Sequence, residues 1–293
     1  MARDKRVLIL GVIAAVALVV WITALLPGPR TMQVTFFDVG DGLCTLIRTP
    51  SGRTLIMDCG TSSWRDPSDV GHKLIAPYLQ SQGLSSIDAL VLSHPHLDHL
   101  SGIPGLLRAE PASLVMDAGE EEQSSEYFAF RRAIRNCHAR YRKLKCGQTI
   151  DMGDGVTAQV IGPPSGADYP NGNDRSVVLR VAFGRVAVLL EADAGEEAET
   201  EMVASGARLR AQVLQVGHHG SALSTSPQWL SAVKPSIAVI SCSSHSRYGF
   251  PSRKVLDRLA SCGARTYTTG RSGAVTITTD GASVRVSTVR PTW

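Results

Sequence analysis

Short apolar runs of about four to eight residues, bounded by glycine, proline or charged residues, recur from residue 32 onward. Such runs are typical of buried strands, and the amphipathic stretches between them are typical of helices. The pattern predicts strands at 32–39, 43–49, 53–59, 87–92, 113–118, 157–161, 177–183, 186–190, 212–216, 237–241, 275–279 and 284–289. It predicts helices at 70–82, 102–107, 123–145, 196–204, 227–233 and 252–261. This interleaving indicates an α/β fold with mixed sheets.

The first apolar stretch differs from the others in length. Residues 7–26 contain no charged residue, and a helix of about 20 such residues spans a bilayer core of about 30 Å. Arg3, Lys5 and Arg6 precede it, which predicts a cytoplasmic N-terminus and places the rest of the chain across the membrane. A cleaved signal peptide is the alternative, but its apolar core is usually only about 7–15 residues long. We therefore favour a retained single-pass anchor.

The composition is that of a globular protein. The 293 residues are 43% hydrophobic and 19% charged, which excludes a largely disordered chain. The net charge is +4, and the basic N-terminal segment supplies most of it, so the global charge does not indicate a nucleic-acid partner. No linker rich in serine, proline or glycine follows residue 30. We expect a basic tip and anchor at 1–30 and one domain at 31–293.

Side chains that bind metals are most concentrated after the strand at 87–92. Three of the eight histidines lie there, in the sequence Ser93-His94-Pro95-His96-Leu97-Asp98-His99. Residues i and i+2 of an extended segment point the same way, so His94 and His96 can hold one ion together. Asp98 and His99 lie after the chain turns and can reach a second ion. Imidazole and carboxylate suit zinc first, and also manganese or iron, so two divalent metal ions are predicted; a solvated polar loop is the alternative.

This stretch resembles the H-x-H-x-D-H signature of the metallo-β-lactamase fold. Its Ser-His-Pro-His start and Leu-Asp-His-Leu-Ser-Gly end are similar to one branch of that family. That branch is the hydrolase domain attached to the bacterial DNA-uptake channel protein ComEC, together with its stand-alone relatives. The resemblance implies an αββα sandwich, here preceded by a single N-terminal transmembrane helix, with two metals in a cleft and a metal-bound hydroxide that attacks the substrate.

Two further carboxylates follow predicted strands. Asp193 comes after the strand at 186–190, and the resemblance implies that it bridges the two metals; a helix N-cap is the alternative. Asp58 ends the strand at 53–59. Its implied role is to hydrogen-bond the loop that presents the histidines, which would fix the orientation of the ligands.

A pair of histidines follows the strand at 212–216. His218 and His219 lie in a Val-Gly-His-His-Gly-Ser string that matches the late metal-binding motif of the resembled family. Neighbouring residues on an extended chain point apart, so one ring is expected to bind the metal that carries Asp98 and His99. We expect His218 to be that ligand. His219 would then face the substrate as a catalytic group or hold His218 in place.

The resemblance also implies substrate contacts for Asn173, Arg175, Ser221 and Tyr248. Two of their motifs depart from the family pattern. Asn-x-Asn-Ser appears as Asn-Asp-Arg-Ser, which introduces a cation, and Tyr-Gly-His-Pro appears as Tyr-Gly-Phe-Pro, which removes a histidine that would face the cleft. We therefore expect the metal centre to be intact and the positioning of the substrate to differ.

The strongest basic cluster lies within the predicted helix at 123–145. Its members are Arg131, Arg132, Arg135, Arg140, Arg142, Lys143 and Lys145, with no acidic residue among 131–145. The cluster could follow a nucleic-acid backbone, and a solvated helix face is an equal alternative.

These features predict a membrane-anchored, two-metal phosphodiesterase or nuclease whose domain lies outside the cytoplasmic membrane. Two metals generate a nucleophile from water and brace the phosphate, and Asp98 would act as the general base. Single-stranded DNA and a separate DNA-uptake channel protein are the expected partners. The alternatives are a hydrolase of a cell-envelope phosphoester or small ester, and a weakly catalytic partner of a DNA-uptake apparatus.

The six cysteines are evidence on the cellular compartment in which the domain lies, because stable disulfides form in oxidising compartments. Folding the hairpin about Ser51 and Gly52 places Cys44 opposite Cys59, where a disulfide could form. Such a bond would require an oxidising compartment, in agreement with the predicted anchor. Two small buried thiols are the alternative.

Overall fold

The computed structural model describes residues 21, 30–63, 66–164, 166 and 169–291. The chain divides into two units, Met1–Arg30 and Thr31–Trp293, and the second is described below. The predicted anchor at 7–26 lies outside the described residues, apart from Trp21. Among the residues that are described, no helix combines the length and the apolar character needed to cross a bilayer.

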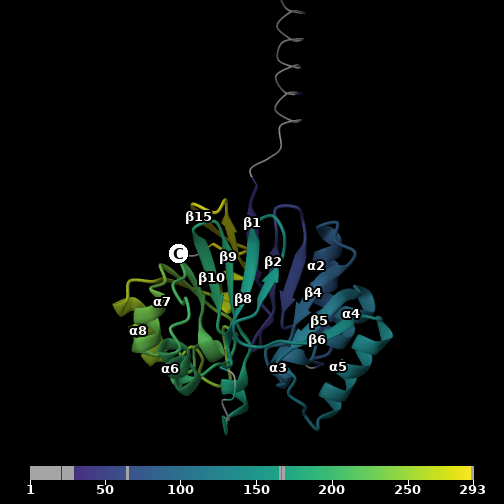
Figure 1. Ribbon diagram of the computed structural model, residues 1–293, viewed down its shortest axis with the longest axis horizontal. Coiled ribbons are helices and arrows are strands. Elements are labelled where there is room, and N and C mark those ends of the chain that lie inside the picture. The colour runs from purple at the N-terminus through teal and green to yellow at the C-terminus, as the bar shows by residue number, and fades with distance from the viewer. Residues whose placement is uncertain (1–20, 22–29, 64–65, 165, 167–168, 292–293) are drawn as a thin grey trace, which may run out of the picture. The chain divides into compact units, whose positions relative to one another are not determined.

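Two β-sheets pack face to face at the centre of the domain (Figure 1). The eight-stranded sheet has the order β15-β14-β1-β2-β3-β4-β5-β6. Its strands are β1 (Met32–Phe36), β2 (Thr45–Arg48), β3 (Thr54–Met57), β4 (Ile87–Val91), β5 (Ala112–Asp117), β6 (Arg140–Lys143), β14 (Val275–Thr279) and β15 (Val284–Thr288). The seven-stranded sheet has the order β13-β12-β11-β10-β9-β8-β7. Its strands are β7 (Thr149–Asp151), β8 (Val156–Gly162), β9 (Val178–Phe183), β10 (Val186–Leu190), β11 (Val213–Gln215), β12 (Ile237–Ile240) and β13 (Arg265–Thr268).

Helices cover the outer face of each sheet (Figure 1). The helices on the first sheet are α2 (Ala76–Ser81), which continues a π-helical turn η1 (Gly71–Ile75), α3 (Leu97–Leu100), α4 (Ile103–Ala109) and α5 (Ser125–Asn136). Those on the second sheet are α6 (Glu196–Ala204), α7 (Pro227–Val233) and α8 (Arg253–Ser261). The short elements η2 (Gly172–Arg175), η3 (Gly217–Gly220) and α9 (Thr269–Ser272) lie in loops. This arrangement confirms the αββα sandwich.

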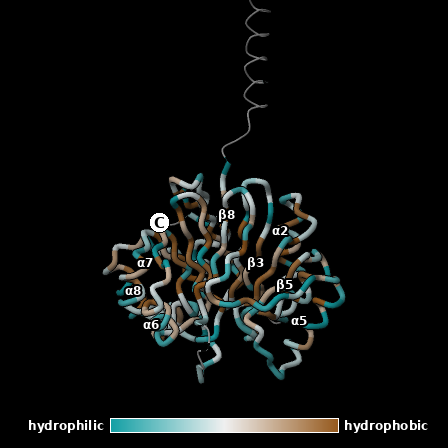
Figure 2. The backbone as a smooth tube through the Cα atoms, in the orientation of Figure 1, coloured by the Kyte–Doolittle hydropathy of each residue, from teal (hydrophilic) through white to brown (hydrophobic). Residues whose placement is uncertain are grey.

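Three apolar layers hold the four layers of structure together. Residues of both sheets, such as Val91 of β4 and Val188 of β10, form the layer between the sheets. Leu90 of β4 packs in the layer under the helices of the first sheet, and Trp229 of α7 packs in the layer under those of the second. Figure 2 accordingly shows the hydrophobic colour gathered in the strands. From Ala89 to Val91 β4 is buried on both faces, so these three residues are all apolar, whereas Asp88 near the start of the strand is exposed.

The direction of the strands places the loops that follow their carboxyl ends at one edge of the sandwich. In the first sheet β3, β4 and β5 run parallel. In the second sheet β10, β11 and β12 run parallel. The carboxyl ends of parallel strands share one edge of a sheet, and loops at that edge are where ligands bind in α/β folds.

The predicted helix at 123–145 is wrong beyond Asn136. Helix α5 ends there, His138 turns the chain with φ of 57°, and Arg140–Lys143 form the edge strand β6. His138 is exposed. The basic residues are therefore divided between α5 and β6. Arg131 of α5 packs against the strand, since its guanidinium carbon lies 4.2 Å from the centre of the Tyr141 ring.

The predicted register of the β2–β3 hairpin is also wrong, by one residue. Thr45 pairs with Met57, because a three-residue loop joins Thr49 to Arg53, whose carbonyl accepts a 2.9 Å hydrogen bond from the Thr49 amide. Cys44 and Cys59 are both buried free thiols, so the predicted disulfide is absent from the structure.

Candidate metal centre

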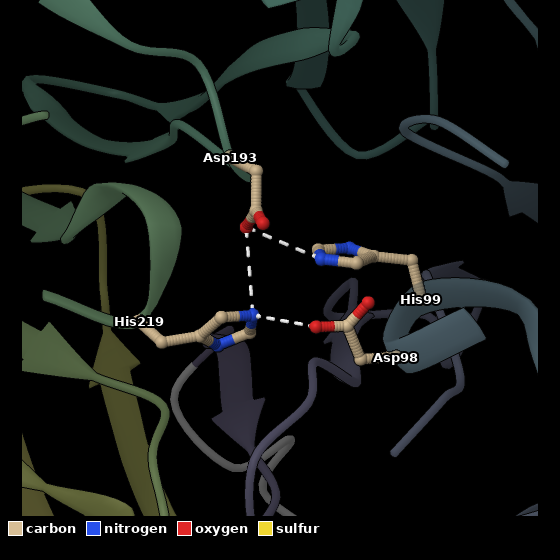
Figure 3. Close-up of side chains that lie close together, drawn as sticks. All are labelled: Asp98, His99, Asp193 and His219. Carbon is tan, nitrogen blue, oxygen red and sulfur yellow. Dashed lines mark ion pairs between the residues drawn. The ribbon is translucent and has the colours of Figure 1, made fainter. Parts of the chain in front are cut away.

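Four side chains from three loops converge at the edge described above. Asp98 and His99 come from α3, Asp193 from the turn after β10, and His219 from η3 after β11. Figure 3 shows their polar ends pointing toward one another, and one ligand atom of each lies within 4.8 Å of the others.

The spacing of these atoms fits a bound metal ion. Asp193 Oδ1 lies 3.2 Å from His99 Nε2 and 3.6 Å from His219 Nε2, and His219 Nε2 lies 3.4 Å from Asp98 Oδ2. Ligand atoms on a tetrahedral zinc ion are about 3.3 Å apart, given metal–ligand bonds of about 2.0–2.1 Å. Within the described chain, His99 Nε2, Asp193 Oδ1 and His219 Nε2 are buried without a hydrogen-bond partner. Three such atoms in one place are costly unless an ion binds them.

The other nitrogen of each ring is held by the protein. His99 Nδ1 lies 2.8 Å from Asp58 Oδ2, and His219 Nδ1 lies 2.9 Å from the Ser241 carbonyl oxygen. In each case Nδ1 donates to this oxygen, and Nε2 of the ring points into the cluster (Figure 3). Metal-binding histidines are commonly oriented by such a second hydrogen bond.

Asp58 also organises the end of β4. Its carboxylate accepts hydrogen bonds of 2.7 Å from the Ser93 amide and from the Ser93 hydroxyl. The side chain is buried and its backbone has φ of 58°. These are the contacts that its expected role requires, because Ser93 opens the loop that carries the histidines.

His94 and His96 form a second group of donors beside the first. His94 Nε2 lies 3.0 Å from His96 Nδ1, and the His94 and His99 rings are 4.2 Å apart between centres. Burial, and then the neighbouring His99, hold the pKa of His94 well below its usual value. The ring is therefore neutral at physiological pH, which is the form that binds metals.

The histidines and carboxylates of the cluster shift one another's pKa in the direction that favours the charged forms. Burial disfavours the charged ring of His99, but the carboxylates of Asp193 and Asp58 hold its pKa well above the usual value. Burial likewise opposes ionisation of Asp193, yet His99 and His219 hold the pKa of this carboxyl well below the usual value. The pKa of Asp98 is also lowered, against its burial, mainly by its contact with His219.

The structure brings His219 rather than His218 into the four-residue cluster, whereas the sequence argument expected His218 to be the ligand. His218 Nε2 is 3.7 Å from Asp193 Oδ2, and its ring nitrogens face Asn173 Nδ2 at 3.4 Å. The sequence argument assumed an extended chain. Instead, the two histidines occupy a tight turn with φ of 46° and 54° and direct their rings differently.

The residues expected to contact substrate are not equally placed to do so. Asn173 is beside the His218 ring, and Tyr248 is 53% exposed. Ser221 is buried, and its hydroxyl accepts a hydrogen bond from the Leu223 amide. It is thus part of the turn rather than of an open surface.

Arg175 is held within the protein. Its Nε and one terminal nitrogen donate to the Tyr169 carbonyl oxygen at 2.9 and 2.6 Å. The other terminal nitrogen pairs with Glu120 at 3.1 Å. These contacts tie the segment before β9 to the loop after β5.

Ser176 is a residue of the site that the sequence argument missed. Its hydroxyl lies 3.2 Å from His94 Nδ1 and accepts a 3.3 Å hydrogen bond from the Asp193 amide. It therefore connects the two groups of metal donors. Its place in the Asn-Asp-Arg-Ser string was the available signal.

Residues 37–245 match the metallo-beta-lactamase superfamily. The chain belongs to this family. The match takes in strands β2 to β12, the histidine loop, Asp193 and the His218–His219 turn.

Relatives with competence-related names cover most of the chain. Recombination protein 2 of Haemophilus influenzae is 34% identical over 84% of this chain, and Competence protein ComA of Neisseria gonorrhoeae is 32% identical over 83% of it. ComE operon protein 3 of Bacillus subtilis is 30% identical over 83% of it. The aligned part is 29%, 31% and 32% of those proteins respectively, so the chain spans about a third of their length.

Solved structures of the family share the fold at low identity. YhfI from Bacillus subtilis superposes with a TM-score of 0.56 at 15% identity, over 82% of this chain and 96% of YhfI. CmlA, a diiron β-hydroxylase from Streptomyces venezuelae, gives 0.53 at 14% identity, over 82% of this chain and 53% of CmlA. These likenesses establish the αββα architecture alone.

Proposed function

We propose that the chain is a metal-dependent phosphodiesterase that acts on single-stranded DNA. The observation that carries this proposal is the cluster of Asp98, His99, Asp193 and His219, with three buried ligand atoms that lack partners within the described residues. The names of the relatives, which refer to recombination and competence, support DNA as the substrate class.

The donor set would hold two divalent ions. His94 and His96 would hold one ion, Asp98, His99 and His219 would hold the other, and Asp193 would be shared. When bound, such ions supply a hydroxide nucleophile near neutral pH and positive charge against the phosphate oxygens. Zinc is the first expectation, and manganese and iron are the alternatives.

The chain's own groups supply the rest of the chemistry. Asp98 is the most exposed member of the cluster, at 25% of its side chain, and its lowered pKa keeps it ionised. It would accept the proton of the attacking water as general base. His219, expected from sequence to be catalytic, has both ring nitrogens committed in the structure, one to Ser241 and one to the cluster. Its proposed role is therefore as a ligand.

Metal analysis and hydrolysis by the full chain test this function. We expect about two transition-metal ions per chain, and hydrolysis of bis(p-nitrophenyl) phosphate and of a single-stranded oligonucleotide. Asp98→Ala should lower kcat by about 10²-fold or more, the usual contribution of a general base. Asp257→Ala, at an exposed ion pair on α8, is the control. Turnover of only lactams, thioesters or envelope phosphoesters would overturn the proposal.

The location is a further part of this proposal. Residues 7–26 would anchor the chain, with the N-terminus in the cytoplasm, the domain outside, and a separate uptake channel as partner. The basic residues before the apolar run support this orientation. Protease added to intact spheroplasts should then digest the domain, and protection until lysis would contradict the orientation.

A further inference from the structure

A row of aromatic rings leads from the metal cluster to the surface. The Phe250 ring lies 6.2 Å from the His219 ring between centres, with an angle of 28° between their planes. The Tyr248 ring lies 5.7 Å from Phe250, with an angle of 30°. Both spacings are within the range of offset stacking. The loop between β12 and α8 thus extends an aromatic series outward from a proposed metal ligand.

The outer member of the row is open to solvent. Tyr248 is 53% exposed, whereas Phe250 is partly buried against His218 and His219. Packing within the fold accounts for Phe250. It does not account for a large ring that leaves more than half of its surface in water beside the proposed site.

The charge around Tyr248 suits an anionic ligand. The guanidinium carbon of Arg247 lies 4.9 Å from the centre of the Tyr248 ring, and one of its nitrogens donates to the Tyr248 hydroxyl at 2.8 Å. Residues 241–252 contain no acidic residue. An aromatic face with an arginine against it is the combination that proteins use for unpaired bases of single strands.

We propose that Tyr248 and Phe250 form a stacking subsite for an unpaired nucleobase of a single strand. The strand's phosphate would lie at the metal cluster, the neighbouring base would stack on the exposed part of Tyr248, and Arg247 would face the backbone. The subsite rests on the proposed function. It narrows the substrate to one that carries a planar base next to the scissile phosphate, and it gives a role to the phenylalanine that replaces histidine in the Tyr-Gly-Phe-Pro string.

Binding to two matched oligonucleotides tests the subsite. One is a fluorescein-labelled oligothymidylate, and the other is an abasic strand of equal length and phosphate number. Anisotropy titrations use the metal-loaded full chain, and phosphorothioate linkages in both strands keep them from being hydrolysed. Stacking on one ring contributes about 5- to 150-fold in affinity, so wild type should prefer the thymidylate by a factor in this range.

Three variants sharpen the test. Tyr248→Ala should reduce the preference to near unity, and Tyr248→Phe should retain it, because the ring rather than the hydroxyl carries the stacking. Leu223→Ala is the matched control, since Leu223 is 70% exposed on the turn that follows His219 but has no aromatic ring. It should leave the preference unchanged.

Equal binding of the two strands by wild type would overturn the subsite, and so would an equal loss for both strands in Tyr248→Ala. These outcomes are distinct from failure of the proposed function. A chain that hydrolyses bis(p-nitrophenyl) phosphate but does not distinguish the strands keeps the function and rejects the subsite. A chain that prefers the thymidylate but hydrolyses no phosphodiester keeps the subsite and rejects the enzymatic activity.

Discussion

The carboxylate of Asp58 lies 2.8 Å from Nδ1 of His99, and the opposite nitrogen of that ring lies 3.2 Å from Asp193. One residue at the end of β3 thereby fixes how a histidine from α3 meets a carboxylate from the other sheet. The site depends on this contact across the sandwich, because neither sheet alone supplies all the donors.

Replacement of Asp58 should therefore weaken metal binding without removing a metal ligand. In Asp58→Ala the His99 ring loses the acceptor that orients it, and the loss of such a contact typically costs about 10- to 100-fold in metal affinity. Competition with a chelating dye measures this change. Asp88→Ala is the control, since Asp88 also accepts a backbone hydrogen bond between β3 and β4, from Thr54, but lies away from the cluster. Equal affinities in the two variants would contradict the role.

The two adjacent histidines should differ in their effect on metal content. His219→Ala removes a buried ring nitrogen from the cluster, so the purified variant should hold close to one ion fewer per chain than wild type. His218→Ala removes a ring that lies outside the four-residue cluster and is 24% exposed, so this variant should retain more metal. Elemental analysis of both variants decides between them, and the reverse order would restore His218 as the ligand.

Most of the donors could be found from the sequence because each follows a buried strand. An apolar run that ends in histidine or aspartate predicts both the strand and the position of a candidate ligand, as for His94 after β4 and Asp193 after β10. The choice between His218 and His219 could not be made in this way. It depends on a turn in which His218, His219 and Gly220 all have positive φ, and of these three only the glycine is a residue type that indicates such a conformation.

Two errors in the fold predicted from sequence have similar local causes. Strand β6 is short, charged and at the edge of its sheet, so it lacks the apolar alternation that reveals a strand. The β2–β3 register depends on whether the turn has two or three residues, and a slip of one residue moves every side chain to the other face. The hydrophobic pattern predicted both strands of the hairpin but not the length of its turn.

Replacement of Arg175 tests whether this residue contacts the substrate itself or only positions a neighbouring segment of the chain. Its guanidinium binds Glu120 and the Tyr169 carbonyl oxygen, so it should act by holding the segment before β9 in place. Arg175→Ala and Glu120→Ala should then raise KM for a phosphodiester by similar factors, and the double variant should add little to either. If Arg175→Ala alone raises KM and also flattens its dependence on salt, the side chain contacts the phosphate directly.

The buried thiol of Cys242 should make the stability of the protein depend on alkaline pH. Burial, and then Asp41 and Asp38, raise the pKa of this thiol to about 12, above the value of about 8.5 for a free cysteine. Between these values the folded chain keeps a proton that the unfolded chain has lost. The contribution of Cys242 is therefore fully present below about pH 8.5 and is lost as pH rises toward 12, by at most about 1.4 kcal/mol per pH unit. Cys242→Ala should make the decline with pH shallower by up to this amount, whereas Cys262→Ala, at an exposed position after α8, should leave the decline as in wild type. Urea unfolding of both variants between pH 8 and 10.5 measures the difference, and parallel curves would show that the Cys242 thiol ionises as readily in the folded chain as in the unfolded one.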